Sequence, residues 1–249
     1  MAAQKPIIVI VPGAFLKPIH YRKITKLLHD QGFEVIPIDL VVTGENADPE
    51  MTFLDDAVEI RRHLVPRLDE GREAVILSHS YGSLPSTHAT EGQTVTERAA
   101  KGLKGGITAV VNLAGFAFPA RGKSVLGDDT IVPPMPFHVV ENGITHLQES
   151  GKPIFFNNLS PEEAEAEWAA LDKTQTRKSF TAFPQYVESE IRCSKLYIVC
   201  EKDVAVPPAW QEDMAQVGGY VVERIDAGHD AFLTHSEDVV AVVLKACSI

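Results

Sequence analysis

The chain has 249 residues, of which 45% are hydrophobic, and a formal net charge of −11 at pH 7. This size and composition predict one globular domain with a substantial core and exclude a disordered chain. Because the chain is acidic and has no basic run, we expect no nucleic acid and no membrane partner, which leaves small molecules as ligands. The apolar run at residues 7–11 is too short for a signal peptide or a membrane span.

Cysteine usage points to a reducing compartment. Cys193, Cys200 and Cys247 are odd in number and lack the spacing of metal ligands. We therefore expect no disulfide framework, no bound metal and a cytoplasmic location.

Short β-branched runs alternate with longer amphipathic segments along the chain. We expect strands at residues 7–11, 33–38, 74–77, 107–113, 195–200 and 220–225, and helices at 21–30, 53–68 and 238–245. Thr52 is the expected N-cap of the second helix, whose buried stripe would comprise Leu54, Ala57, Val58, Arg61 and Leu64. The alternation predicts an α/β protein with a mostly parallel, doubly wound sheet of about six strands.

Residues 119–190 interrupt this alternation. They contain no clear strand and many prolines, and Ser160 followed by Pro161 and two glutamates is typical of a helix start. We predict that residues 1–118 and 191–249 form the core and that 119–190 form an inserted cap. Most aromatic residues of this segment are expected to pack within the cap, while some face the sheet edge where ligands bind.

The most specific motif is Ser-His-Ser-Tyr-Gly-Ser at residues 78–83, directly after the third expected strand. In the nucleophile elbow G-x-S-x-G, small residues flank a serine at a tight strand-to-helix turn. Gly82 keeps the second glycine, and Ser78 is a small residue at the first position. Ser80 is therefore the expected nucleophile, while His79 is expected to pack beneath the sheet. A serine-rich turn without chemistry is the alternative.

A second turn, at residues 12–15, is expected to face the elbow. The third strand of such a sheet lies beside the first, so the turns after these two strands meet at one edge. Backbone amides at this edge can bind a developing oxyanion. We expect these amides to belong to Tyr81 and Ala14, with Phe15 as the alternative to Ala14. An ordinary strand-ending turn is the simpler interpretation of residues 12–15.

Chain order indicates an acid and a base. In hydrolases with this elbow, the acid follows a late strand and the histidine follows the last strand. Asp203 follows the fifth expected strand here, and His229 follows the sixth. Glu201 is less suitable because it lies close to the strand end, and Asp226 because it precedes His229 too closely. His235 is the only rival base.

Together these residues resemble the α/β-hydrolase superfamily, and most closely the branch that contains plant methyl esterases, such as salicylate esterases, and hydroxynitrile lyases. The resemblance covers nearly the whole chain, and the cap matches only loosely. It is carried by residues 11–15, 79–82, 201–203 and 227–229, and by Pro207 and Gln211. In that family the nucleophile, acid, base and oxyanion amides fall on Ser80, Asp203, His229, Tyr81 and Ala14.

The chain departs from the family pattern at a few positions. The family usually has a histidine where Pro12 stands, and glycines where Ser78 and Ser83 stand. The lyases of this branch carry a threonine in place of Gly13 and a lysine after the catalytic histidine, in place of Asp230. Because both lyase residues are absent, the resemblance favours ester chemistry.

We therefore expect a hydrolase that cleaves a small-molecule carboxylic ester or lactone through an acyl-enzyme on Ser80, with no cofactor. Two alternatives stay open: a lyase or cyclase that uses the same residues for proton abstraction, and a non-catalytic small-molecule binding protein on the same fold. The residues expected to bind substrate are Phe15, Phe116, Phe137, Phe155 and Trp168. Substrate identity and oligomeric state do not follow from the sequence.

Overall fold

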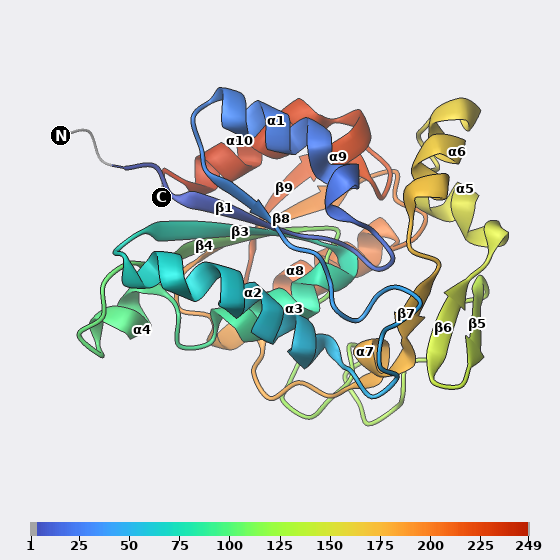
Figure 1. Ribbon diagram of the computed structural model, residues 1–249, viewed down its shortest axis with the longest axis horizontal. Helices are drawn as coiled ribbons and strands as arrows, with labels where there is room; N and C mark the ends of the chain where they lie inside the picture. Colours follow the sequence, from blue (N-terminus) through green and yellow to red (C-terminus); the bar gives the residue numbers. More distant parts are fainter. Residues whose placement is uncertain (1–3, 249) are drawn as a thin grey trace.

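The computed structural model describes residues 4–248, and its centre is a six-stranded parallel sheet (Figure 1). Across the sheet the strands are β2 (Val35–Pro37), β1 (Ile7–Val11), β3 (Glu73–His79), β4 (Gly106–Leu113), β8 (Ser194–Cys200) and β9 (Val221–Ile225). All six expected strands are present, and β3 pairs with β1 on the side away from β2. The predicted fold class, α/β with a doubly wound parallel sheet, is confirmed.

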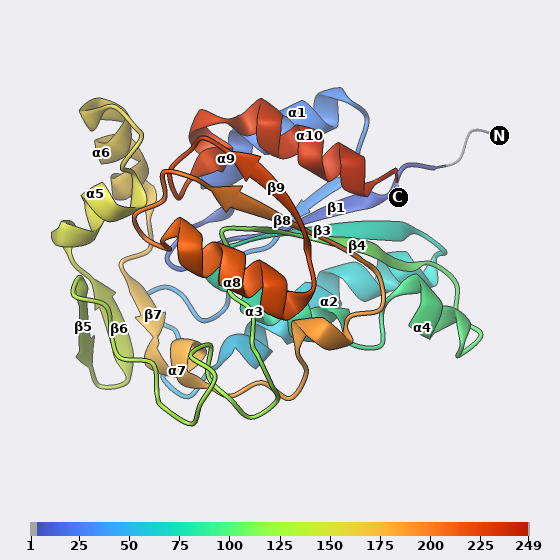
Figure 2. The same cartoon turned by 180° about the vertical axis from the view of Figure 1, so that it is seen from behind.

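Helices cover both faces of this sheet (Figures 1 and 2). On one face lie α1 (Arg22–Asp30), α9 (Ala231–Thr234) and α10 (Ser236–Ala246), and on the other lie α2 (Phe53–Asp69), α3 (Ser83–Thr90), α4 (Val95–Ala99) and α8 (Pro208–Gly218). Within the described residues, no helix combines the length and the apolar character needed to cross a bilayer.

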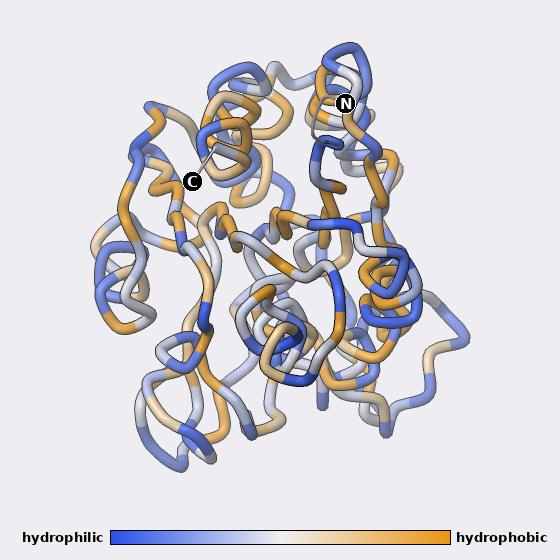
Figure 3. Tube along the Cα trace, turned by 90° about the vertical axis from the view of Figure 1, so that its left-hand side faces the viewer, coloured by the Kyte–Doolittle hydropathy of each residue, from blue (hydrophilic) through white to orange (hydrophobic). Residues whose placement is uncertain are grey.

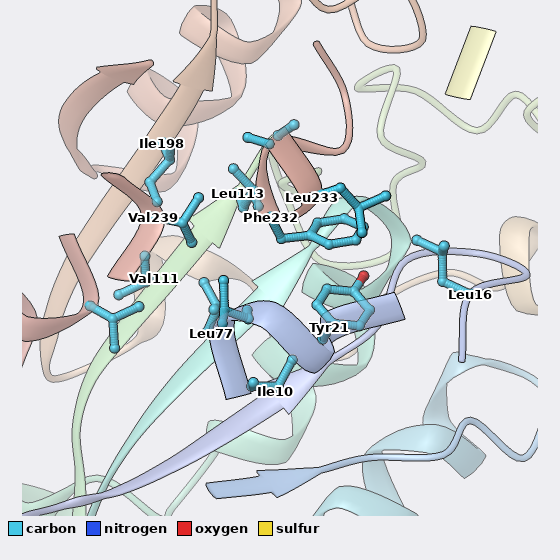
Figure 4. Packing of buried hydrophobic residues seen from close by; sticks show 14 of the residues in the cluster. Ile10, Leu16, Tyr21, Leu77, Val111, Leu113, Ile198, Phe232, Leu233 and Val239 are labelled. Carbon is cyan, nitrogen blue, oxygen red and sulfur yellow. The ribbon is translucent and has the colours of Figure 1, made fainter. Parts of the chain in front are cut away.

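Successive side chains of β1 enter different cores, as the two-residue period of a strand requires. Ile8 and Ile10 pack in the cluster that includes residues of α1 and α10, whereas Ile7 and Val9 pack in the cluster with α2. Figure 4 shows Ile10 beside side chains of neighbouring strands in the first cluster. Figure 3 shows hydrophobic and hydrophilic residues alternating along the outer helices, as expected for elements with one buried face.

The buried face of α2 differs from the predicted stripe. Thr52 caps the helix as expected, with its Oγ accepting from the amide of Leu54 (3.1 Å). However, Leu54 and Val58 are exposed, and the buried residues are Phe53, Asp56, Ala57, Ile60, Leu64 and Leu68. The predicted stripe is right at Ala57 and Leu64 and wrong at Leu54 and Val58. The buried Asp56 carboxylate accepts hydrogen bonds from the Tyr81 hydroxyl (2.7 Å) and the Val41 amide (2.8 Å).

The chain between β4 and β8 contains a second sheet of three short antiparallel strands, β5 (His138–Glu141), β6 (Ile144–Leu147) and β7 (Thr174–Thr176). The expectation of no strand here is wrong. These strands have only three or four residues, so the sequence carries little periodicity. The turn Asn142-Gly143, with both residues at positive φ (50° and 79°), is a hairpin signal that could have predicted β5 and β6.

Three short helices complete this segment: α5 (Lys152–Phe155), α6 (Pro161–Ala170) and α7 (Arg177–Thr181). Ser160 caps α6 as expected, and its amide in turn donates to the Glu163 carboxylate (3.2 Å). The second sheet, α5 and α6 lie beyond the carboxyl ends of the main strands (Figure 1). That residues 119–190 form a unit of their own stays a prediction.

Candidate active site

Ser80 lies at the junction of β3 and the helix that follows it, in a strained backbone conformation. Its φ is +49°, in the left-handed region that few non-glycine residues adopt. Gly82 is needed for the same turn, because a Cβ there would lie 2.4 Å from the carbonyl oxygen of Pro12. Ser78, at the first small position, is buried and donates its hydroxyl hydrogen to the Asn112 side chain. The strain and the close approach are those of a nucleophile elbow.

The Asp203 carboxylate is buried and fully engaged in hydrogen bonds. Its Oδ2 accepts from His229 Nδ1 (2.7 Å) and from Gln211 Nε2 (2.9 Å). Its Oδ1 accepts from the amides of Ala205 (2.8 Å) and Val206 (2.9 Å). The four bonds hold the carboxylate in one orientation, and the bond to Nδ1 turns the other nitrogen of His229 away from Asp203.

The rival acids and the rival base lie elsewhere. Glu201 and Asp226 are exposed, and Asp226 pairs with Lys202 (2.6 Å). His235 contacts the hydroxyl of Thr234 (2.9 Å) and is not among the residues that line the cavity above Ser80.

His229 is buried and carries a perturbed pKa. Burial lowers the pKa, but the charge and hydrogen bond of Asp203 and the charge of Asp230 raise it more, so the pKa ends above its usual value of 6.5. Ser80 and His229 line the same cavity. Among residues 4–248 no hydrogen bond joins their side chains; the His229 ring bonds to Asp203 instead.

The two backbone amides expected to bind an oxyanion, those of Tyr81 and Ala14, stay a prediction. The amide of Phe15 already donates to Gln175 Oε1 (3.0 Å), so Ala14 is the better donor from the turn after β1. Tyr81 lies in the first turn of the helix after the elbow, where amides lack intrahelical partners. Its ring is held below the elbow by the bond to Asp56, which fixes the position of its amide.

A chain of hydrogen bonds connects the turn after β1 to His229. The Gly13 amide donates to the Tyr21 hydroxyl (3.0 Å), which donates to His79 Nδ1 (2.9 Å). His79 Nε2 in turn donates to the carbonyl of His229 (3.1 Å). Burial and the charge of His229 lower the pKa of His79 well below its usual value, so His79 is neutral. The sequence predicted only a packing role for His79 and did not predict these hydrogen bonds. The Tyr21 ring stacks on Phe232 at 4.2 Å between centroids (Figure 4).

Asp230, next to His229, is a buried carboxyl without hydrogen bonds. Within residues 4–248 neither of its oxygens has a hydrogen-bond partner, and its nearest basic nitrogen, His79 Nε2, lies 3.7 Å from Oδ1. Burial raises the pKa of Asp230 to about 7. The sequence analysis identified Asp230 only as the residue that stands where the lyases of the resembled branch carry a lysine.

A cavity of about 590 Å³ opens above Ser80 and His229, a size typical of small-molecule sites. It is mostly apolar. Four of the five residues expected to bind substrate line it: Phe15, Phe116, Phe137 and Phe155. The expectation for Trp168 is not met, because this residue of α6 is buried away from the cavity lining and its Nε1 donates to the Glu149 carboxylate (2.7 Å). In the part of the chain that the structure describes, no cluster of three metal-ligating side chains is present.

The segment after β4 is bonded to the turn after β1. The Asp172 amide donates to the Phe15 carbonyl (2.9 Å), while Phe15 itself donates to Gln175 of β7. Lys17 pairs with the Asp172 carboxylate (2.8 Å). The turn after β1 and the chain at residues 172–175 are therefore joined by hydrogen bonds and an ion pair.

Comparison with known proteins gives the same family as the geometry. The model of the "Alpha/beta hydrolase family" matches residues 8–242. The chain is 26% identical to "Alpha/beta hydrolase nvfD" of Aspergillus novofumigatus, over 97% of this chain and 96% of the relative. It is 30% identical to "Probable hydrolase R7" of a Phoma species, over 90% and 91%.

A solved structure supports the fold. Polyneuridine aldehyde esterase superimposes with a TM-score of 0.75 at 20% identity, covering 97% of this chain and 99% of that one. The family model spans nearly all of the central sheet and the segment above it. The chain belongs to the alpha/beta hydrolase family.

Proposed function

We propose that this protein hydrolyses a small-molecule carboxylic ester or lactone through an acyl-enzyme on Ser80. The observation that carries the proposal is the buried Asp203–His229 pair, 2.7 Å apart, which faces the same cavity as a serine held at φ +49°. A strained serine beside a paired histidine is the arrangement of nucleophilic catalysis. The relatives' names, which include two hydrolases and an esterase, agree with this chemistry.

In the proposed mechanism, Ser80 Oγ attacks the ester carbonyl while His229 Nε2 accepts the serine proton. The carbonyl oxygen becomes an oxyanion bound by the amides of Ala14 and Tyr81. The tetrahedral intermediate collapses, and the leaving alkoxide takes the proton from His229. Water then attacks the acyl-enzyme, His229 accepts a proton from it, and Ser80 leaves with that proton as the carboxylic acid is released. Asp203 stabilises the imidazolium in both steps.

The first test is Ser80→Ala, measured on aryl, alkyl and lactone esters and by labelling with a fluorophosphonate probe. We expect turnover to fall by about 10⁴- to 10⁶-fold and labelling to disappear, with the unfolding midpoint little changed. Ser248→Ala, at an exposed serine, is the matched control and should keep both. Activity above about a tenth of wild type in Ser80→Ala contradicts the nucleophile assignment.

The two alternatives predict different results. A binding protein without turnover would leave the wild type unlabelled by the fluorophosphonate. A lyase would turn over a cyanohydrin faster than an ester. The geometry at Gly13 favours the ester, because a Cβ there would lie 2.7 Å from His79 Nδ1 and leaves no space for the threonine expected of such lyases. The three free cysteines accord with the cytoplasmic location that we propose.

A further inference from the structure

Three polar side chains in the cavity wall have no role in the proposed mechanism: Arg177, His138 and Asp213, the last of which is exposed on α8. Arg177 begins α7, and His138 begins β5, so both come from the segment between β4 and β8. Both line the cavity that contains Ser80 and His229. Much of the remaining wall is apolar, with Trp210, Met214 and Val217 contributed by α8.

Arg177 is a cation without an anion. None of the ion pairs among residues 4–248 includes it, although its neighbour Lys178 pairs with Glu50. Its guanidinium donates a single hydrogen bond, to the carbonyl of Val132. Burial lowers the pKa of Arg177, and a guanidinium remains charged in proteins. Most of its donors are therefore available to a ligand, and leaving a half-buried charge unpaired is costly.

His138 is also without a protein partner. Its Nε2 is buried and makes no hydrogen bond within the described residues. The ring is held by aromatic neighbours, with centroids 4.8 Å from Phe137, 5.4 Å from Phe15 and 5.8 Å from Phe180. Burial and the charge of Arg177 lower the pKa of His138 to about 4, so the ring is neutral at pH 7 and can donate one hydrogen bond.

The contact with Phe15 places His138 near the reacting centre, because Phe15 follows the oxyanion donor Ala14. A ligand group that reaches both side chains must accept hydrogen bonds and benefit from a positive charge. A carboxylate meets both requirements, since its two oxygens match the fork of a guanidinium.

We propose that Arg177 and His138 form a subsite for a carboxylate of the substrate, so that this enzyme prefers apolar esters that carry a second, free acid group. This inference rests on the proposed ester hydrolysis and names its substrate class. The apolar wall then binds the hydrocarbon part, and the subsite binds the end that remains ionised throughout the reaction. The step at Ser80 is unchanged.

The test compares two aryl esters of one straight-chain diacid that differ only at the far end, where one has a free carboxylate and the other a carboxamide. The measured quantity is the ratio of their kcat/KM values. We expect wild type to favour the carboxylate about tenfold or more, and Arg177→Gln to lower the ratio about 10- to 100-fold. Arg177→Lys keeps a positive charge without the fork and should retain part of the preference.

Lys178→Gln is the matched control, because it removes the neighbouring positive charge from an exposed position. Its ratio should equal that of wild type. The inference is overturned if wild type shows no preference for the carboxylate, if Arg177→Gln keeps the wild-type ratio, or if Lys178→Gln lowers the ratio as much as Arg177→Gln.

A binding measurement separates this inference from the proposed function. Decanoate and decanamide are titrated calorimetrically into Ser80→Ala, with and without Arg177→Gln. We expect tighter binding of decanoate, and loss of that difference when Arg177 is replaced. If no ester is hydrolysed but decanoate is preferred, the proposed hydrolysis fails and the subsite stands. If esters are hydrolysed and the two ligands bind equally, the subsite fails and the hydrolysis stands.

Discussion

Replacing Asp230 with asparagine should raise the free energy of unfolding, relative to wild type, more at high pH than at low pH. The Asp230 carboxyl is buried, makes no hydrogen bond to any residue that the structure describes, and has its pKa raised from 3.8 to about 7. In the folded protein the neutral form is favoured, so folding holds a proton that the unfolded chain releases above pH 4. Stability is therefore lost as pH rises from about 4 through 7.

The size of this loss follows from the shift. Each pKa unit corresponds to about 1.4 kcal/mol, so a rise from 3.8 to about 7 costs at most about 4 kcal/mol once Asp230 is fully ionised. Between pH 5 and pH 8 the loss grows by about 2 to 3 kcal/mol. Asp230→Asn removes the titration. Any cost of burying the amide is the same at both pH values and cancels in the comparison.

The assay is urea unfolding of wild type and Asp230→Asn at pH 5 and pH 8. The free energy of unfolding of the variant relative to wild type should rise by about 2 to 3 kcal/mol from pH 5 to pH 8. Asp226→Asn, at an exposed carboxylate paired with Lys202, is the control and should show no such rise. A difference between Asp230→Asn and wild type that stays constant or falls with pH would refute the reasoning.

The proposed mechanism allows three further predictions. Asp203→Asn should lower turnover by about 10⁴-fold, because an asparagine favours the wrong tautomer of His229, whereas Glu201→Gln should change it little; equal losses would move the acid role. The kcat/KM of a neutral ester should rise with pH to a plateau with a midpoint above 6.5, because His229 must be neutral and its pKa is raised. Asp230→Asn should lower this midpoint, since the charge of Asp230 contributes to the rise; a profile without an acid limb would remove His229 as the base.

The sheet and its active edge could be predicted because their signals are local. A buried parallel strand such as β1 is a run of apolar residues, and the elbow at Ser80 needs small neighbours in a short motif. The strand order then follows from general topology, which brings the turns at residues 12–15 and 80–82 together. The Asp203–His229 contact, formed across 26 residues, was predicted from chain order alone.

Features that depend on contacts between distant segments could not be predicted in this way. Asp56 is buried and accepts hydrogen bonds from Tyr81 and Val41, two contacts that the spacing of apolar residues in α2 does not predict. Trp168 is a large aromatic residue of the kind that often lines pockets. Its indole Nε1 instead donates a hydrogen bond to the Glu149 carboxylate. His79, at the end of β3, likewise bonds to Tyr21 and to His229, which lie far from it in the sequence, and no spacing in the sequence encodes these bonds.

The bonds of Phe15 with Asp172 and Gln175 join the turn after β1 to the chain around β7. A rigid outward movement of that chain would break these bonds and shift Phe15 together with Ala14, the residue before it. Entry of substrate beside α8, where Trp210 is half exposed at the cavity, would leave both bonds in place. We therefore expect substitutions in β7 to alter reaction rate as well as substrate choice.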